Sequence, residues 1–113
     1  MFKRRSYVFL SLPLLIVAGS ASAISDVQYQ SILALGDLNG VALHCGYHAE
    51  TRRIKGTLIR TLPKRRQLGE VYEEATNKSY LKFIDEKQRC PEEADFVKQV
   101  DQAIEHLQTL FQK

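Results

Sequence analysis

Apolar residues along this chain recur at every third or fourth position, which is the period of an amphipathic α-helix. The spacing predicts four helical segments, over residues about 25–47, 48–62, 64–86 and 91–112. No stretch alternates apolar and polar residues for long enough to predict a strand. We therefore expect an all-α fold, a small bundle of three to four helices.

The first predicted helix is the one around which we expect the others to pack. Ser25 followed by Gln28 fits a capping box, which marks a helix start. Gly36 and Gly40 can be interpreted in two ways: as a flat stripe that another helix approaches closely, or, with Asn39, as a turn that divides the segment. Because the apolar pattern keeps its phase on both sides, we favour one helix and leave open whether it breaks at Asn39-Gly40.

Two prolines mark helix boundaries further along the chain. The residue before a proline is biased away from the helical conformation, so Leu62-Pro63 predicts a break, with Pro63 in the first turn of the next helix. Pro91 followed by Glu92 and Glu93 predicts the start of the last helix. Proline suits a first turn, and acids there favour the positive end of the helix dipole.

Residues 1–23 are typical of a secretory signal peptide. Three basic residues near the N-terminus precede an apolar stretch over residues 7–18, and an A-x-A cleavage site follows. The apolar stretch is shorter than the roughly 20 residues that span a bilayer. We expect residues 24–113 to form one helical domain that is soluble in the periplasm or secreted, with no membrane span after cleavage.

The chain has two cysteines, Cys45 and Cys90. An exported protein enters an oxidising compartment, where paired cysteines form disulfides. The pair also lacks the C-x-x-C spacing of redox-active cysteines. We predict a disulfide between the first and last helical regions. In the chain-entropy model, closing a loop of this length stabilises the fold by about 4 kcal/mol.

Charge is distributed unevenly. The whole chain has 16 basic and 13 acidic residues, and the predicted signal peptide carries all three excess bases, so the mature chain is formally neutral. Neutrality and export give no reason to expect nucleic-acid binding. Residues 51–66 nevertheless hold seven bases and no acid, namely Arg52, Arg53, Lys55, Arg60, Lys64, Arg65 and Arg66. They form either a surface that binds an acidic partner or a solvated face that balances the acidic last helix.

His44 and His48 are four residues apart, which would place them on one face of a helix at a spacing that metal ligands use. A metal would need further ligands, for which Glu50 and His106 are possible, and a disulfide would remove Cys45 as one. We therefore expect no metal site and no cofactor. Because no catalytic motif is present, we interpret the chain as non-enzymatic.

The overall plan resembles the small acid-activated periplasmic chaperones. The features that match are the export signal, the single cysteine pair Cys45 and Cys90, and a charged C-terminal helix. The plan is similar in the same way to the small helical immunity proteins that neutralise periplasmic cell-wall amidases. Both resemblances are of architecture across the mature chain, and they imply a helical fold and a protein partner or client.

These features support three hypotheses, in this order. The first is an exported protein-binding module, such as an inhibitor or immunity-type protein, whose partner is another periplasmic or secreted protein. The second is an acid-stress periplasmic chaperone, because carboxylates lose their charge below pH about 4 and leave a strongly positive chain. The third is a metal-binding protein that uses His44 and His48. A homodimer is also possible through apolar residues off the main stripes: Leu33, Leu43, Tyr47 and Leu110.

Overall fold

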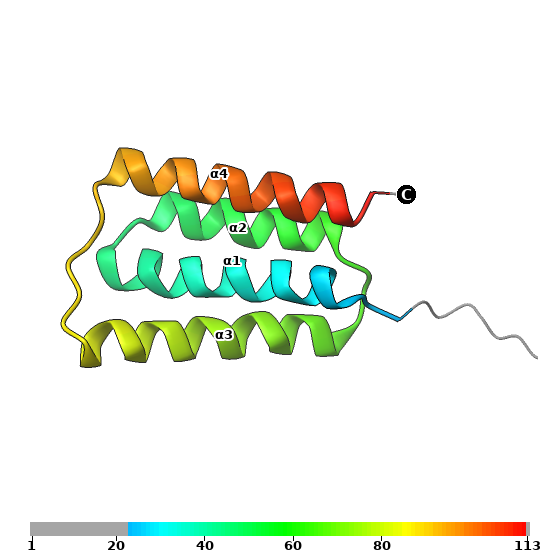
Figure 1. The fold of residues 1–113 in the computed structure, drawn as a ribbon, viewed down its shortest axis with the longest axis horizontal. Helices are drawn as coiled ribbons and strands as arrows, with labels where there is room; N and C mark the ends of the chain where they lie inside the picture. Colours follow the sequence, from blue (N-terminus) through cyan, green and yellow to red (C-terminus); the bar gives the residue numbers. More distant parts are fainter. Residues whose placement is uncertain (1–22, 113) are drawn as a thin grey trace, which may run out of the picture.

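The computed structural model describes residues 23–112, which form four α-helices and no strand. They are α1 (Asp26–Cys45), α2 (His48–Thr61), α3 (Arg66–Asp85) and α4 (Glu93–Leu110). Successive helices alternate in direction, so that α1 and α3 run one way and α2 and α4 the other (Figure 1). The expected all-α bundle is confirmed. The predicted signal peptide lies, apart from Ala23, outside the described residues.

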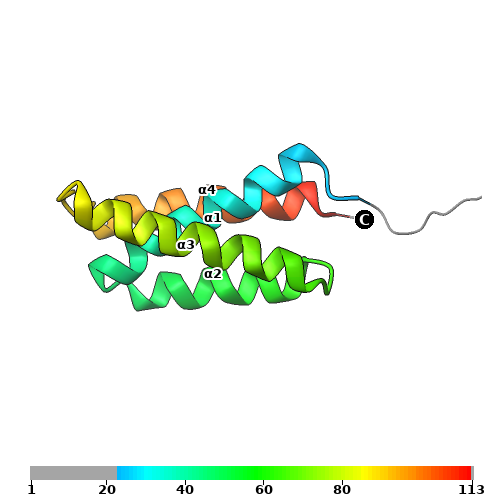
Figure 2. The same cartoon turned by 90° about the horizontal axis from the view of Figure 1, so that it is seen from below.

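Helix α1 is the centre of the bundle, because it packs against each of the other three helices. The view turned by 90° shows that the four helices do not lie in one plane (Figure 2). Apolar residues from all four helices form a common core, with Ile32 and Leu35 of α1 completely buried. Its other buried members are Ala42, Ile54, Leu58, Leu68, Tyr72, Phe96, Val100, Ile104 and Leu107. The apolar periodicity of the sequence therefore corresponds to the buried faces.

Helix α1 continues through Asn39 and Gly40 without a break. It begins at the expected capping box of Ser25 and Gln28, in which both reciprocal hydrogen bonds are present. Its two internal glycines meet α3. A Cβ atom added to Gly36 would lie 2.5 Å from the Cβ of Ala75, far inside the usual contact distance of about 3.5–4.0 Å. The close-approach interpretation of the glycines is confirmed.

The same interface continues one turn further along α1. A Cβ added to Gly40 would lie 2.6 Å from the Cβ of Ser79 and 2.7 Å from the backbone nitrogen of Tyr80. The Ser79 hydroxyl donates a hydrogen bond to the Asp37 carbonyl oxygen at 2.7 Å. We call this contact, centred on Gly36, Gly40, Ala75 and Ser79, the α1–α3 interface.

Helix ends differ from the sequence-based bounds at three places. Gly46 ends α1 in the left-handed conformation, at φ 77°, which glycine adopts without steric cost. Pro63 lies in an extended connection and not in the first turn of α3, which begins at Arg66. Pro91 likewise precedes α4, whose N-cap is Glu92. In each case the helix is shorter than predicted, because the connection needs extended or left-handed backbone.

The predicted disulfide between Cys45 and Cys90 is present. Cys45 is the last residue of α1, and Cys90 lies in the connection before α4. Beside it, the Tyr47 hydroxyl donates a hydrogen bond to the carbonyl oxygen of Pro91 at 2.6 Å, and the Tyr47 ring packs on Phe96. Tyr47 therefore stabilises the fold itself.

No helix among the described residues is long and apolar enough to cross a membrane.

Candidate functional site: a basic surface and an apolar groove

The seven bases of residues 51–66 do not form one surface. An α-helix turns by about 100° per residue, so the five residues from Arg52 to Gly56 already point around most of α2. Arg53 faces α4 and is used within the fold. Lys55, Lys64 and Arg65 line a groove between α2 and α3. The remaining three, Arg52, Arg60 and Arg66, are exposed and lie outside that groove.

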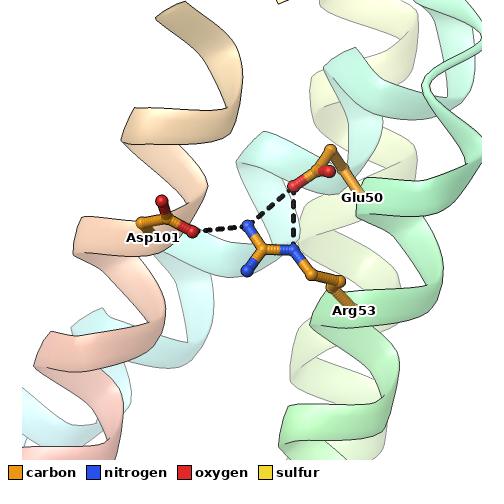
Figure 3. Close-up of polar contacts among 3 residues, drawn as sticks. All are labelled: Glu50, Arg53 and Asp101. Atoms are coloured by element: carbon orange, nitrogen blue, oxygen red, sulfur yellow. Dashed lines mark hydrogen bonds and ion pairs between the residues drawn. The ribbon is translucent and has the colours of Figure 1, made fainter. Parts of the chain in front are cut away.

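Arg53 joins α2 to α4 through two carboxylates (Figure 3). Its guanidinium donates to the carboxylate of Glu50 at 2.8 and 3.1 Å and to Asp101 at 2.7 Å. The hydrogen bond to Glu50 is the main reason why the pKa of Arg53 rises above its usual value. Glu50 is buried, so Arg53 supplies the charge that makes its burial tolerable. Arg53 therefore has a role within the fold, where it joins α2 to α4.

The three bases outside the groove have a different environment. Within residues 23–112, Arg52, Arg60 and Arg66 form no ion pair. Arg60 lies over the backbone of Gly56, with Nη1 3.1 Å from where a Cβ would stand. All three residues are exposed to solvent. These side chains are thus available to a partner molecule.

The start of α3 carries two arginines at positions that helices disfavour. Arg65 is the N-cap, with no side-chain cap hydrogen bond, and Arg66 is the first helical residue. The first turn contains no acid. Helix N-termini carry partial positive charge and favour acids or short polar caps, so these two bases oppose the local preference of the helix. Helix stability alone does not account for this choice of residues.

A hollow of about 320 Å³ lies between α2 and α3, over the connection that joins them. Within residues 23–112, close backbone contacts join α1 to every other helix and α2 to α4, but not α2 to α3. Apolar side chains form most of its lining, and we call it the α2–α3 groove. It is lined by Lys55, Leu58, Ile59, Leu62, Pro63, Lys64, Arg65, Leu68, Gly69, Tyr72 and Glu73.

Helix packing does not explain two residues that line the groove. Ile59 is 60% exposed, although it is a large apolar residue. Gly69 has nothing within 4 Å of an added Cβ, so packing does not require a glycine there. Tyr72, by contrast, is buried, and burial raises its pKa to about 12. Its hydroxyl is one of the buried polar groups without a hydrogen-bond partner among the described residues.

The structure separates the two histidines that had suggested a metal site. His44 is in α1 and His48 begins α2, with the left-handed Gly46 between them, so the expectation that they share one helical face is wrong. The His44 ring packs against Phe83 of α3, 4.8 Å between centroids. The carboxylate of Glu50 is hydrogen-bonded to Arg53. In the described part of the chain, no group of three or more His, Cys, Asp or Glu residues could hold a metal ion.

Sequence reasoning did not find the groove or the buried position of Phe96. The groove depends on the distance between α2 and α3, which the spacing of apolar residues in the sequence does not specify. Phe96 is almost fully buried, whereas its neighbour Val97 is only partly buried. The relevant signal was available, since Phe96 lies four residues before Val100 and eight before Ile104.

Among the apolar residues considered for a dimer, only Leu43 is exposed, at 41%. Leu33 and Leu110 are half-buried in the bundle.

A comparison with protein-family models finds no match, and neither the curated proteins nor the solved structures contain a significant one. The functional argument therefore rests on the surface of this chain.

Proposed function

We propose that this chain is an exported, non-enzymatic protein-binding module, such as an inhibitor or an immunity-type protein, with one dedicated partner that presents an acidic surface. The observation that carries the proposal is the group of three exposed bases outside the groove, Arg52, Arg60 and Arg66, of which Arg66 lies in the first turn of α3, where the helix dipole disfavours it. Residues that oppose local stability often serve a function. A disulfide is typical of proteins in oxidising compartments, which supports export.

Two of the exposed bases lie close enough together for one partner to cover both. Arg52 and Arg60 are eight residues apart on α2, which is about 12 Å along a helix. A stable interface buries about 800 Å² on each partner. A patch of that area is wider than the separation of the two side chains, so it could cover both. Unpaired bases at such an interface would raise the association rate with an acidic partner and make it sensitive to salt.

The test is a pull-down from periplasmic extract of the source cells, with the oxidised mature protein as bait. We expect one stoichiometric partner at neutral pH, released by moderate salt. The test variant is Arg52→Glu/Arg60→Glu/Arg66→Glu, which omits Arg53 because its reversal would damage the fold. It should lose the partner while its circular dichroism stays unchanged.

A matched variant controls for net charge. Lys87→Glu/Arg89→Glu/Lys98→Glu changes the charge by the same amount at exposed positions elsewhere on the molecule. It should retain the partner. If both triple variants bind as the parent does, Arg52, Arg60 and Arg66 are not part of the binding surface and this form of the proposal fails.

A second candidate, the acid-stress chaperone, is favoured by the charge of residues 24–113, which hold 13 bases and 13 acids. Carboxylates as a class lose their charge below pH about 4, so in acid this chain would become strongly positive and repel itself. The protein should then prevent an acid-labile test enzyme from aggregating at pH 3 but not at pH 7. No protection at pH 3 would eliminate this candidate.

A further inference from the structure

We propose that the α2–α3 groove is a binding site for a small free amphiphile with one apolar chain and an anionic head, a fatty-acid-like carboxylate. The proposal does not depend on the protein partner proposed above. It rests on the shape of the groove, on the order of charges along it and on two lining residues that packing leaves unexplained.

The groove has the size and composition of a ligand site. Its volume of about 320 Å³ is at the lower end of the range of about 300–1,000 Å³ for small-molecule pockets. The floor is formed by Leu58, Leu68 and Tyr72, all buried, and Ile59 extends it to the surface. Binding an apolar chain would remove the exposed surface of Ile59 from water, which is favourable in proportion to the area buried.

The ends of the groove differ in charge. Lys64 and Arg65 lie at the end formed by the α2–α3 connection, so that end is basic. Lys55 lies on α2, seven residues before Leu62, and Glu73 lines the α3 side. Helices α2 and α3 run in opposite directions (Figure 1). Lys55 and Glu73 therefore belong to the far end, where one base and one acid offset each other. The charge pattern therefore places an anionic head at Lys64 and Arg65 and the chain over the floor.

The basic end retains donors for such a head. Lys64 uses one N–H to donate to the Ile59 carbonyl oxygen at 2.8 Å. An ammonium has three donors, so this hydrogen bond fixes the side chain and leaves others for a carboxylate. The hydrogen bond also holds the amine beside the apolar floor, next to Ile59. A head and a chain of one molecule can thus be bound together.

Gly69 keeps the α3 side of the groove open. A glycine inside a helix costs about 1 kcal/mol relative to alanine, and no neighbour within 4 Å requires it at this position. A larger side chain there would project from the lining of the groove. Selection for an open groove explains a residue that the packing of the helices does not.

A free molecule fits this surface better than a lipid within an anionic bilayer. Glu73 is exposed and lines the groove on its α3 side. Its carboxylate would be pressed against the headgroups of an anionic membrane and repelled by them. A single monomeric amphiphile entering the groove meets only Glu73, at the end opposite to its head.

The experiment uses the oxidised mature protein and titrates it with hexanoate, octanoate and decanoate below their micelle concentrations, by calorimetry and by amide chemical shifts. We expect saturable 1:1 binding with shifts at the groove residues. Each added pair of methylenes should strengthen binding roughly tenfold until the groove is filled. Decanol should bind more weakly than decanoate, and decyltrimethylammonium weaker still.

Variants locate the site. Lys64→Glu should weaken decanoate binding roughly tenfold or more, because it reverses a charge beside the head. Gly69→Phe should abolish binding by filling the groove, and if that variant does not fold, Ile59→Glu at an exposed position takes its place. Arg52→Glu is the matched control on the outer face of α2 and should bind decanoate almost as the parent does.

The proposal is overturned if decanoate does not saturate, or if binding is equal in the parent and in the groove variants. Binding to phosphatidylglycerol vesicles but not to monomeric decanoate would also overturn it, in favour of a membrane surface. These outcomes are independent of the pull-down, since Arg52, Arg60 and Arg66 lie outside the groove.

Discussion

Helix α3 meets α1 and α2 in opposite ways. Towards α1, Gly36 and Gly40 allow the helices to approach until an added Cβ would lie 2.5–2.7 Å from atoms of α3. Towards α2, a hollow of about 320 Å³ remains, and Gly69 faces open space. Glycines in one helix bundle thus serve different purposes, and only the neighbouring atoms distinguish a glycine required by packing from one that leaves a surface open.

The difference also shows what holds each helix. Helix α3 is fixed by its close contact with α1, and Asn39 supports it by donating to the Thr76 hydroxyl at 3.3 Å. Helix α2 is fixed from the other side, by the core beneath it and by the Arg53 bridge to α4. Because each helix has its own attachment, the space between them need not be filled for the fold to be stable.

The largest effect is expected from filling the α1–α3 interface. Gly36→Leu/Gly40→Leu should destabilise the protein by about 3 kcal/mol or more, since each insertion into a packed site costs about 1–3 kcal/mol. Denaturant unfolding followed by circular dichroism measures it. The matched control, Gly69→Leu on the groove side, should gain about 0.5–1 kcal/mol from helix propensity. Equal changes in stability from the α1–α3 variant and from Gly69→Leu would refute the contrast between the two sides of α3.

A smaller effect is expected from removing the attachment of α2. Arg53→Met leaves Glu50 buried without its hydrogen-bond donor, which should cost about 1–3 kcal/mol. Lys55→Met is the matched control on the same helix, and it should change stability by less than about 0.5 kcal/mol, as surface substitutions usually do. Thermal unfolding of both variants at pH 7 provides the measurement. If Lys55→Met were the more harmful, α2 would be held from the groove side.

The smallest effect concerns Asp37, beside the α1–α3 interface. Partial burial raises its pKa, although Lys82 and Lys78 oppose the shift. An acid with a raised pKa in the fold contributes stability that is complete below its unfolded pKa and is lost as pH rises through its folded pKa. Asp37→Asn should therefore stabilise the protein at pH 7 by less than about 0.5 kcal/mol, which is measured as a higher melting temperature. Near pH 3 the substitution should have no effect. A gain that is equal at both pH values would rule out this titration as its cause.

The sequence predicted what depends on local pattern and composition. The four helices, the Ser25 cap and the cysteine pair each follow from spacing or from a short motif. A close approach at the glycines of α1 was one of two interpretations, and the apolar stripe that continued in phase through them favoured an unbroken helix. Such features are encoded within a few residues, so reading the chain locally was enough.

What the sequence did not predict depends on relations between helices. The bases of residues 51–66 looked like one surface, but the turn of α2 directs Arg53 to α4 and Lys55 to the groove. His44 and His48 looked like one helical face, but the left-handed Gly46 separates them. The groove itself arises from the spacing of two helices that are adjacent in sequence yet not packed together. Tertiary geometry decides all three.

The disulfide has a consequence for the covalent topology. The bond between Cys45 and Cys90 closes a ring of chain that contains α2 and α3, and α1 and α4 leave this ring as two arms from the same point. The α2–α3 connection, with Pro63 and Lys64 exposed, is a part of the ring that a protease can reach. One cut there would produce a two-chain protein, with α1 and α2 on one chain and α3 and α4 on the other. The α1–α3 interface, the Arg53 bridge and the disulfide all join these two chains, so the nicked molecule would stay in one piece until it is both reduced and unfolded.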